Sequence, residues 1–117
     1  KDTNQNGLNW NALTEIKQLD SIVDASAEKP VVIFKHSTRC SISRMALKNF
    51  EREYDLAESE AAPYFLDLLE HRDISNEIAQ KFQVIHQSPQ LILIKDGKAV
   101  YNASHSEIDA EALKSKI

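Results

Sequence analysis

Residues 31–50 read VVIFKHSTRCSISRMALKNF and surround Cys40, the one cysteine of the chain. The run VVIFK is continuous, apolar and rich in β-branched residues, which is typical of a strand covered on both faces. Ser37 and Thr38 follow it and are residues that can cap a helix. Apolar residues then recur every four positions at Ile42, Ala46, Phe50 and Tyr54. The stretch therefore predicts a buried strand, a short loop and a helix, with Cys40 in the first turn of that helix.

The rest of the chain supplies the other elements of one domain. Apolar spacing predicts helices over residues 13–26, 73–82 and 106–117, and a second buried strand over residues 63–69. Residues 89–104 predict two strands joined by the hairpin signal Asp96-Gly97. A short first strand at residues 8–10 is a further possibility. Residues 1–9 are expected to be a flexible or edge segment of the single domain 1–117. The order predicts an α/β fold, a mixed sheet with helices on both faces.

Composition narrows the class of protein. The 117 residues are 42% apolar and 27% charged, as expected of one soluble globular domain. The longest apolar runs, Val31–Phe34 and Leu91–Ile94, are too short to cross a membrane, and the polar first ten residues predict no signal peptide. A net charge of −4 without a run of one sign argues against nucleic acid as the main partner. A single cysteine forms no intramolecular disulfide, which predicts a reducing compartment, by default the cytoplasm.

The position of Cys40 predicts a reactive thiol. A helix start favours negative charge, and the thiolate is the species that reacts. Ser43, three residues on, could donate a hydrogen bond to the sulfur. Cationic side chains nearby in the sequence are Lys35, His36, Arg39 and Arg44. A buried, inert core thiol is the alternative, and a metal site has less support because no Cys-x-x-Cys or paired-His spacing is present.

Pro89 stands immediately before an apolar strand, in HQSPQLIL. It is either an ordinary proline at the start of a strand or the second residue of a cis Ser88-Pro89 bond. The residues alone leave both possibilities open.

Taken together, the element order resembles the thioredoxin fold from about Trp10 to the C-terminus. Cys40 lies at the start of the helix after the central strand, and Pro89 matches the cis-proline that faces the reactive cysteine. More specifically, FKHSTRCSIS, HQSPQLILIKDGK and NASHSEI are similar to the YtxJ-type bacilliredoxins. These are monothiol, thioredoxin-like proteins linked to bacillithiol, a low-molecular-weight thiol.

Three positions depart from the patterns of these relatives. Ser43 replaces the resolving cysteine of thioredoxin, and Phe34 replaces its buried acid. Ser41 stands where the bacilliredoxins often have proline. With no second thiol, the chain can form only mixed disulfides with another molecule.

The resemblance implies a thioredoxin-like three-layer sandwich and a monothiol oxidoreductase. Cys40 would remove the small thiol from client proteins, and a second small thiol or a reductase would then release it. The thiolate would be stabilised by Arg39, Ser43 and Thr38. The incoming disulfide would be bound by Ser88, Pro89, His36, Gln87, Arg44 and His105. For Lys35 and Arg44, an exposed and solvated cation is the preferred interpretation.

The same resemblance implies no bound cofactor and no metal. Expected partners are thiolated clients and a bacillithiol-like co-substrate, with no nucleic acid and no membrane, and the protein is expected to be monomeric. A role in stress response would fit, either as a catalyst or as a sensor capped at Cys40 by the small thiol.

Two other functions remain open. CSISR resembles the Cys-x-x-Ser-Arg start of glutaredoxin-linked arsenate reductases, which need several arginines converging on an oxyanion. Past Arg52 the only arginine is Arg72, and none stands beside Pro89, so support is weak. The other is a redox-inert adaptor with the same fold, in which Cys40 would be dispensable.

Overall fold

The strands build one mixed sheet in a computed structural model, which is described here for residues 8–117. The strands are β1 (Asn11–Ala12), β2 (Val31–His36), β3 (Ala62–Asp67), β4 (Gln90–Lys95) and β5 (Lys98–Ser104). The helices are α1 (Gln18–Ala25), α2 (Ser41–Glu53), α3 (Arg72–Phe82), η1 (His105–Glu107, a 3₁₀ turn) and α4 (Ala110–Lys114). In the sheet order β1-β3-β2-β4-β5, β1, β2 and β3 are parallel, whereas β4 is antiparallel to both neighbours. The predicted mixed α/β sheet is confirmed.

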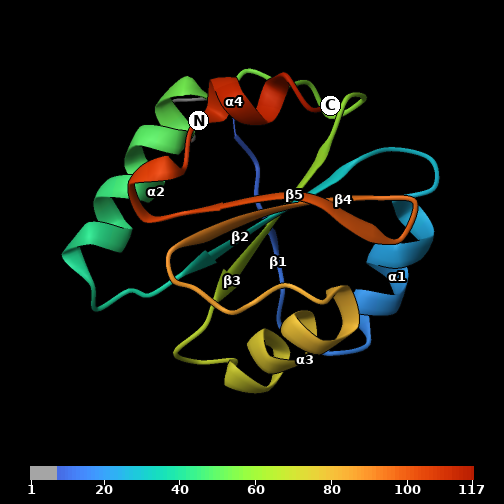
Figure 1. Ribbon diagram of the computed structural model, residues 1–117, viewed down its shortest axis with the longest axis horizontal. Coiled ribbons are helices and arrows are strands. Elements are labelled where there is room, and N and C mark those ends of the chain that lie inside the picture. Colours follow the sequence, from blue (N-terminus) through green and yellow to red (C-terminus); the bar gives the residue numbers. More distant parts are fainter. Residues whose placement is uncertain (1–7) are drawn as a thin grey trace.

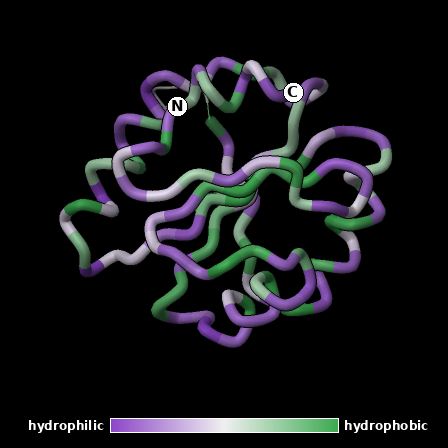
Figure 2. Tube along the Cα trace, in the orientation of Figure 1, coloured by the Kyte–Doolittle hydropathy of each residue, from purple (hydrophilic) through white to green (hydrophobic). Residues whose placement is uncertain are grey.

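Each face of the sheet is covered by two helices and has its own apolar core (Figure 1). Side chains alternate along a strand, so Val31 and Ile33 of β2 pack toward α1 and α3. Val32 and Phe34 pack toward α2 and α4 on the other face. Figure 2 shows the resulting concentration of hydrophobic residues in the central strands. Both faces of β2 are buried, as its unbroken apolar run predicts.

The pairing of β2 with β4 determines where the site lies. Val31 is opposite Ile94, and the register continues to Lys35 opposite Gln90. The chain that leaves β2 toward Cys40 and the chain that enters β4 through Pro89 therefore meet at one end of the sheet. Figure 1 shows these two loops and the end of β5 at the left of the view.

The β4–β5 hairpin turns at the predicted Asp96-Gly97 pair. Both residues have positive φ, 51° and 76°, as a tight two-residue hairpin turn requires. Ser26, after α1, holds this turn: the Asp96 N–H donates to its carbonyl (2.9 Å) and the Gly97 N–H to its hydroxyl (2.7 Å). The far end of the sheet is thus anchored to α1.

The first helix is shorter than its apolar spacing predicts. It begins at Gln18 rather than at Leu13, because the Gln18 Oε1 atom accepts hydrogen bonds from the backbone N–H groups of Thr14 and Glu15. Leu13 is buried, but its N–H continues the sheet by donating to the Phe65 carbonyl. Residues 13–17 therefore form a connection whose apolar residues imitate a helical period.

The two ends of the chain also differ from expectation. The edge strand is Asn11–Ala12, a few residues later than predicted. Residues 1–7 of the expected flexible or edge segment lie outside the described residues, and Leu8 is buried. The final helix is confined to Ala110–Lys114, where Asp109 Oδ1 accepts from the Glu111 N–H as an N-cap.

Substitution of Gly97 by alanine tests the hairpin turn. A Cβ atom there would lie 3.3 Å from Val23 Cγ1, on a backbone with φ +76°. We expect Gly97→Ala to lower the free energy of unfolding by about 1–2 kcal/mol in urea denaturation, since L-residues are strained in this region. Lys98→Ala, at the exposed neighbour, is the matched control and should change stability little. Equal stability of the two variants would contradict this view of the turn.

Candidate functional site

Cys40 occupies the N-cap position of α2, with extended backbone angles (φ −103°, ψ 122°). Its N–H donates to the Ser37 carbonyl (3.2 Å), and its own carbonyl accepts the first helical hydrogen bond, from the Arg44 N–H (3.0 Å). The thiol is partly exposed. The residue lies just before the helix rather than in its first turn, and Ser37 and Thr38 do not cap α2 as expected. Cys40 is therefore the residue that directly precedes the first N–H groups of α2, although its side chain makes no capping hydrogen bond to them.

Ser43 holds the loop rather than the sulfur. Its side chain is fully buried, and its hydroxyl accepts a hydrogen bond from the Ser37 N–H (3.0 Å) and lies 2.8 Å from His36 Nδ1. Both bonds join the start of α2 to the end of β2. The predicted bond from Ser43 to the thiolate is therefore not supported, because the hydroxyl is engaged elsewhere.

His36, the last residue of β2, is buried and belongs to the same hydrogen-bonded group as Ser43. The ring is 4% exposed and packs 5.4 Å from the Phe65 ring. Burial lowers the pKa of His36 below its ordinary value, although Asp67 opposes the shift. When the Ser43 hydroxyl donates a hydrogen bond to His36 Nδ1, every side-chain polar atom of Ser43 and His36 except Nε2 has a partner. A direct contact between His36 and a bound small thiol, expected from the sequence, does not fit this burial.

The cations nearest Cys40 in the sequence remain on the surface. Arg39 and Arg44 are exposed, and so is Thr38. Arg44 Nη1 donates to the Thr38 carbonyl (3.1 Å), which ties the side chain to the loop before Cys40. The proposed roles of Arg39 and Thr38 in stabilising the thiolate, and of Arg44 in binding, stay predictions.

The Pro89 loop forms the other wall of the site. The Ser88-Pro89 peptide bond is cis, and the Pro89 carbonyl accepts from the His105 N–H (3.2 Å). The Gln87 N–H donates to Gln90 Oε1 (3.2 Å), while the buried Ser88 hydroxyl has no hydrogen-bond partner among residues 8–117. The sequence-predicted residues Gln87, Ser88, Pro89 and His105 are thus brought together at the end of the sheet where the Cys40 loop begins.

Lys35 is a residue whose environment the sequence interpretation missed. It is fully buried instead of solvated, and its Nζ atom donates to His86 Nδ1 (2.8 Å) and to Gln90 Oε1 (3.0 Å). Burial lowers the pKa of Lys35 to about 8. The signal was available: Lys35 continues the inward face of Val31 and Ile33 in a strand predicted to be covered on both sides.

Comparison with known proteins assigns the chain to a family. A sequence model described as the monothiol bacilliredoxin BrxC matches residues 11–113. The chain belongs to the monothiol bacilliredoxin family. This match supports the resemblance to bacilliredoxins found in the sequence and the thiol redox role that the family implies.

Comparison with solved structures identifies the fold. One protein, provisionally described as an oxidoreductase with a thioredoxin fold, is 32% identical, with 89% of each chain covered and a TM-score of 0.75. Thioredoxin from Malassezia sympodialis (Mala s 13) is 20% identical, with 92% of this chain and 87% of that chain covered and a TM-score of 0.71. Mitochondrial thioredoxin 3 from Saccharomyces cerevisiae is 19% identical, with 92% of each chain covered and a TM-score of 0.69. The last two likenesses show the thioredoxin fold.

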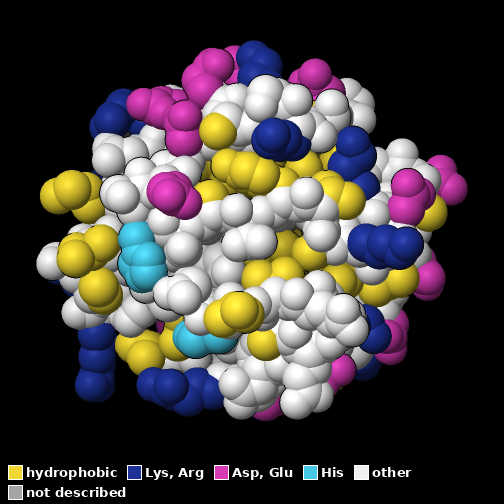
Figure 3. Space-filling view, viewed as in Figure 1, with side chains coloured by type: hydrophobic (Ala, Val, Ile, Leu, Met, Phe, Trp, Pro, Cys, Tyr) yellow, Lys and Arg dark blue, Asp and Glu magenta, His cyan; other side chains and the backbone are white. Residues whose placement is uncertain are grey.

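An apolar surface lies beside Cys40 in this bacilliredoxin. Ile42 and Met45 are 63% and 66% exposed, so the apolar i, i+4 stripe of α2 packs against the core only from Ala46 onward. Figure 3 shows hydrophobic side chains at the left edge, over the start of α2, next to a histidine. A cavity of about 320 Å³ there is lined by Ile42, Met45, Ala46, Asn49, His105, Ser106 and Ile108. It joins the first turns of α2 to the segment that touches Pro89.

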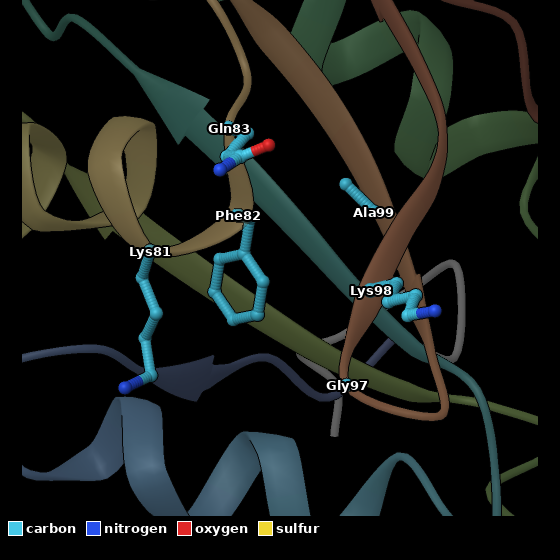
Figure 4. Close-up of a pocket in the computed structure, with 6 residues that line it drawn as sticks. All are labelled: Lys81, Phe82, Gln83, Gly97, Lys98 and Ala99. Atoms are coloured by element: carbon cyan, nitrogen blue, oxygen red, sulfur yellow. The ribbon is translucent and has the colours of Figure 1, made fainter.

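A second cavity, of about 440 Å³, lies at the opposite end of the sheet, by the β4–β5 turn (Figure 4). Its two lysines do not converge on it: Lys81 reaches Asp20 of α1 (3.0 Å), and Lys98 points elsewhere. Within residues 8–117, no helix could span a membrane and no cluster of His, Cys, Asp and Glu could hold a metal ion. Cys40 and its surroundings remain the candidate site.

Removing the Ser43 hydroxyl tests the link between β2 and α2. Ser43→Ala leaves the Ser37 N–H and His36 Nδ1 without their partner, so we expect a loss of about 1–3 kcal/mol in urea unfolding. Ser41→Ala, at an exposed serine of the same helix, should stay within about 0.5 kcal/mol of wild type. A Ser43→Ala protein as stable as Ser41→Ala would refute the structural role.

The buried Lys35 predicts a specific pH dependence. Its pKa is about 8 in the folded protein, against 10.5 in an unperturbed lysine, so between these values the unfolded chain binds more protons. Stability from this residue therefore rises with pH across that window. We expect the wild-type free energy of unfolding, relative to Lys35→Met, to increase between pH 7.5 and 10. A difference that does not change with pH would exclude the lowered pKa.

Proposed function

We propose that this chain removes a small thiol, bacillithiol or one of similar chemistry, from mixed disulfides on client proteins. Membership of the bacilliredoxin family already implies a thiol redox role on a thioredoxin-like fold. The proposal adds the substrate and the direction of the reaction, with Cys40 as the nucleophile.

One observation carries the proposal. Cys40 is the sole cysteine, it is partly exposed at a helix start, and the position of a resolving thiol holds the buried Ser43. A protein built this way cannot store a disulfide of its own. It can accept a thiol from one partner and pass it to another, which is the chemistry of a mixed disulfide.

The exchange balances in two steps. The Cys40 thiolate attacks the small-thiol sulfur of the client's mixed disulfide, the S–S bond breaks, and the client leaves as a thiolate that takes a proton. Cys40 now carries the small thiol. A second small-thiol anion attacks that same sulfur, which yields the small-thiol disulfide and regenerates the Cys40 thiolate.

Two surfaces support access by a client. The backbone of Ser88, before Pro89, would pair with the incoming segment in the manner of an added strand. Exposed Ile42 and Met45 would contact its apolar side chains. A cytoplasmic location, where such adducts form and thiols stay reduced, is part of the same proposal.

The oxyanion-reductase alternative has one feature in its favour. Arg39 and Arg72 line a common cavity of about 440 Å³ near the Cys40 loop. Asp67 and Glu70 line it too, and their negative charges would oppose an oxyanion. The thiol-exchange function is therefore preferred.

Intact-mass measurement on the reduced protein tests the proposal. We expect bacillithiol disulfide to add one bacillithiol to the wild type and none to Cys40→Ser, and to react about tenfold faster than glutathione disulfide, a modest difference in binding energy. Added free bacillithiol should then restore the unmodified mass.

Other outcomes separate the alternatives. No adduct with either disulfide would leave the redox-inert adaptor. Turnover of arsenate in the presence of the small thiol would establish the reductase. An adduct that free bacillithiol does not release would indicate a sensor capped at Cys40 rather than a catalyst.

A further inference from the structure

The end of β2 holds a buried positive charge without a negative partner. Lys35 contacts only uncharged acceptors, His86 Nδ1 (2.8 Å) and Gln90 Oε1 (3.0 Å). Among residues 8–117, no Asp or Glu forms an ion pair with it. A buried ammonium is costly unless an anion compensates it, so the surroundings of Lys35 favour a negative ligand.

The acceptor role of His86 Nδ1 leaves its other ring nitrogen as a donor. The lysine ammonium has only donors, so Nδ1 must accept the hydrogen bond from Lys35, and a neutral ring then carries its own hydrogen on Nε2. Burial, followed by the charges of Lys35 and Arg72, lowers the pKa of His86, which keeps the ring neutral. His86 also connects Lys35 to α3, where the buried Ser75 hydroxyl lies 3.3 Å from Nδ1.

A small cavity lies over this arrangement, between the start of α3 and the loop that precedes Pro89. Its volume is about 150 Å³, and it is lined by Leu68, Arg72, Ser75, Asn76 and His86. All of these side chains except Leu68 can donate hydrogen bonds, and none is acidic. Arg72 forms no ion pair within the described part of the chain.

The cavity connects with the Cys40 loop. Arg72 also lines the neighbouring cavity, whose other walls are Thr38, Arg39, Asp67, Leu69 and Glu70. Thr38 and Arg39 directly precede Cys40, and His86 lies three residues before Pro89. A molecule attached to Cys40 could therefore extend past Arg39 and reach the donor-lined cavity with its far end.

We propose that the cavity between α3 and the Pro89 loop binds a carboxylate end of the small thiol while its sulfur exchanges at Cys40. The inference rests on the proposed function and adds the place where the carboxylate-bearing end of the small thiol binds. At about 150 Å³ the cavity is smaller than the roughly 300–1,000 Å³ of a site for a whole drug-sized ligand, so it takes an end group. In the cavity between the Cys40 loop and this site, the negative charges of Asp67 and Glu70 would suit a protonated amine that lies between the sulfur and the carboxylate of the thiol.

Two size-matched disulfides test the site: bacillithiol disulfide, and the same disulfide with its carboxylates converted to amides. The rate of adduct formation with each is measured by intact mass at fixed ionic strength. In the wild type we expect the carboxylate form to react about tenfold faster, as a charge-assisted contact would give. Arg72→Gln and Lys35→Met should each reduce that ratio to about threefold or less.

Arg52→Gln is the matched control, because Arg52 is an exposed arginine in the last turn of α2, where its guanidinium donates to Asn49 Oδ1 (2.8 Å), and it lines neither cavity. It should keep the wild-type ratio. If it lost the preference as fully as Arg72→Gln, net charge rather than the cavity would explain the effect, and the site would be excluded. Should Lys35→Met not fold, the exposed Arg72 decides the test alone.

The remaining outcomes separate this inference from the function beneath it. Equal rates for both disulfides in the wild type would overturn the carboxylate site and leave thiol exchange at Cys40 intact. A preference that survives both Arg72→Gln and Lys35→Met would place the carboxylate elsewhere. Absence of any adduct would instead refute the proposed exchange itself.

Discussion

The antiparallel pairing of β2 with β4 is the constraint on which the site depends. The register runs from Val31 opposite Ile94 to Lys35 opposite Gln90, and these residues lie in the middle of the sheet, covered on both faces. Beyond the last pair, the segment that follows β2 continues to Cys40, and the segment that precedes β4 contains Pro89. Strand pairing therefore brings Cys40 and Pro89, almost fifty positions apart in the sequence, to the same end of the sheet. No direct contact between the two residues is required for this.

The last two residues of β2 then attach one loop on each face. Consecutive strand residues point in opposite directions, so Lys35 faces α3 and His36 faces α2. His36 engages Ser43 at the start of α2, and Lys35 engages Gln90 and His86 around the Pro89 loop. Buried polar groups are stable only when satisfied, so each pair holds its loop in one arrangement. The apolar part of β2 makes the core, and its polar end orders the site.

This arrangement explains how the fold works with a single thiol. Where thioredoxin has its resolving cysteine, the buried Ser43 holds together the loop that presents Cys40. Where thioredoxin has its buried acid, Phe34 packs against Phe50 with ring centroids 5.5 Å apart. One of these two positions thus serves hydrogen bonding and the other serves packing, and neither provides a second thiol. A monothiol centre therefore needs a second molecule, and the cavities beside Cys40 are where such a molecule can be recognised.

Much of this protein was predictable from local patterns. Strand β2, helix α3, the Asp96-Gly97 turn and the position of Cys40 at a helix start all follow from apolar spacing and turn chemistry over a few residues, as does the family resemblance. Local patterns failed at residues 13–17, where Gln18 side-chain bonds and pairing with β3 override a helical period. They also do not reveal that Ile42 is exposed, since exposure depends on what covers a helix face.

Only the tertiary structure decided the partners of the buried polar residues. The alternation along β2 already places Lys35 on the inward face, but only the pairing with β4 brings Gln90 opposite it. Ser43 looks like a hydrogen-bond donor to the sulfur until the structure shows its hydroxyl beside His36. The sequence by itself determined most of the elements and that a single cysteine stands at a helix start. The fold decided which groups surround that thiol, because hydrogen bonds between distant residues depend on strand register and helix packing, which no short stretch contains.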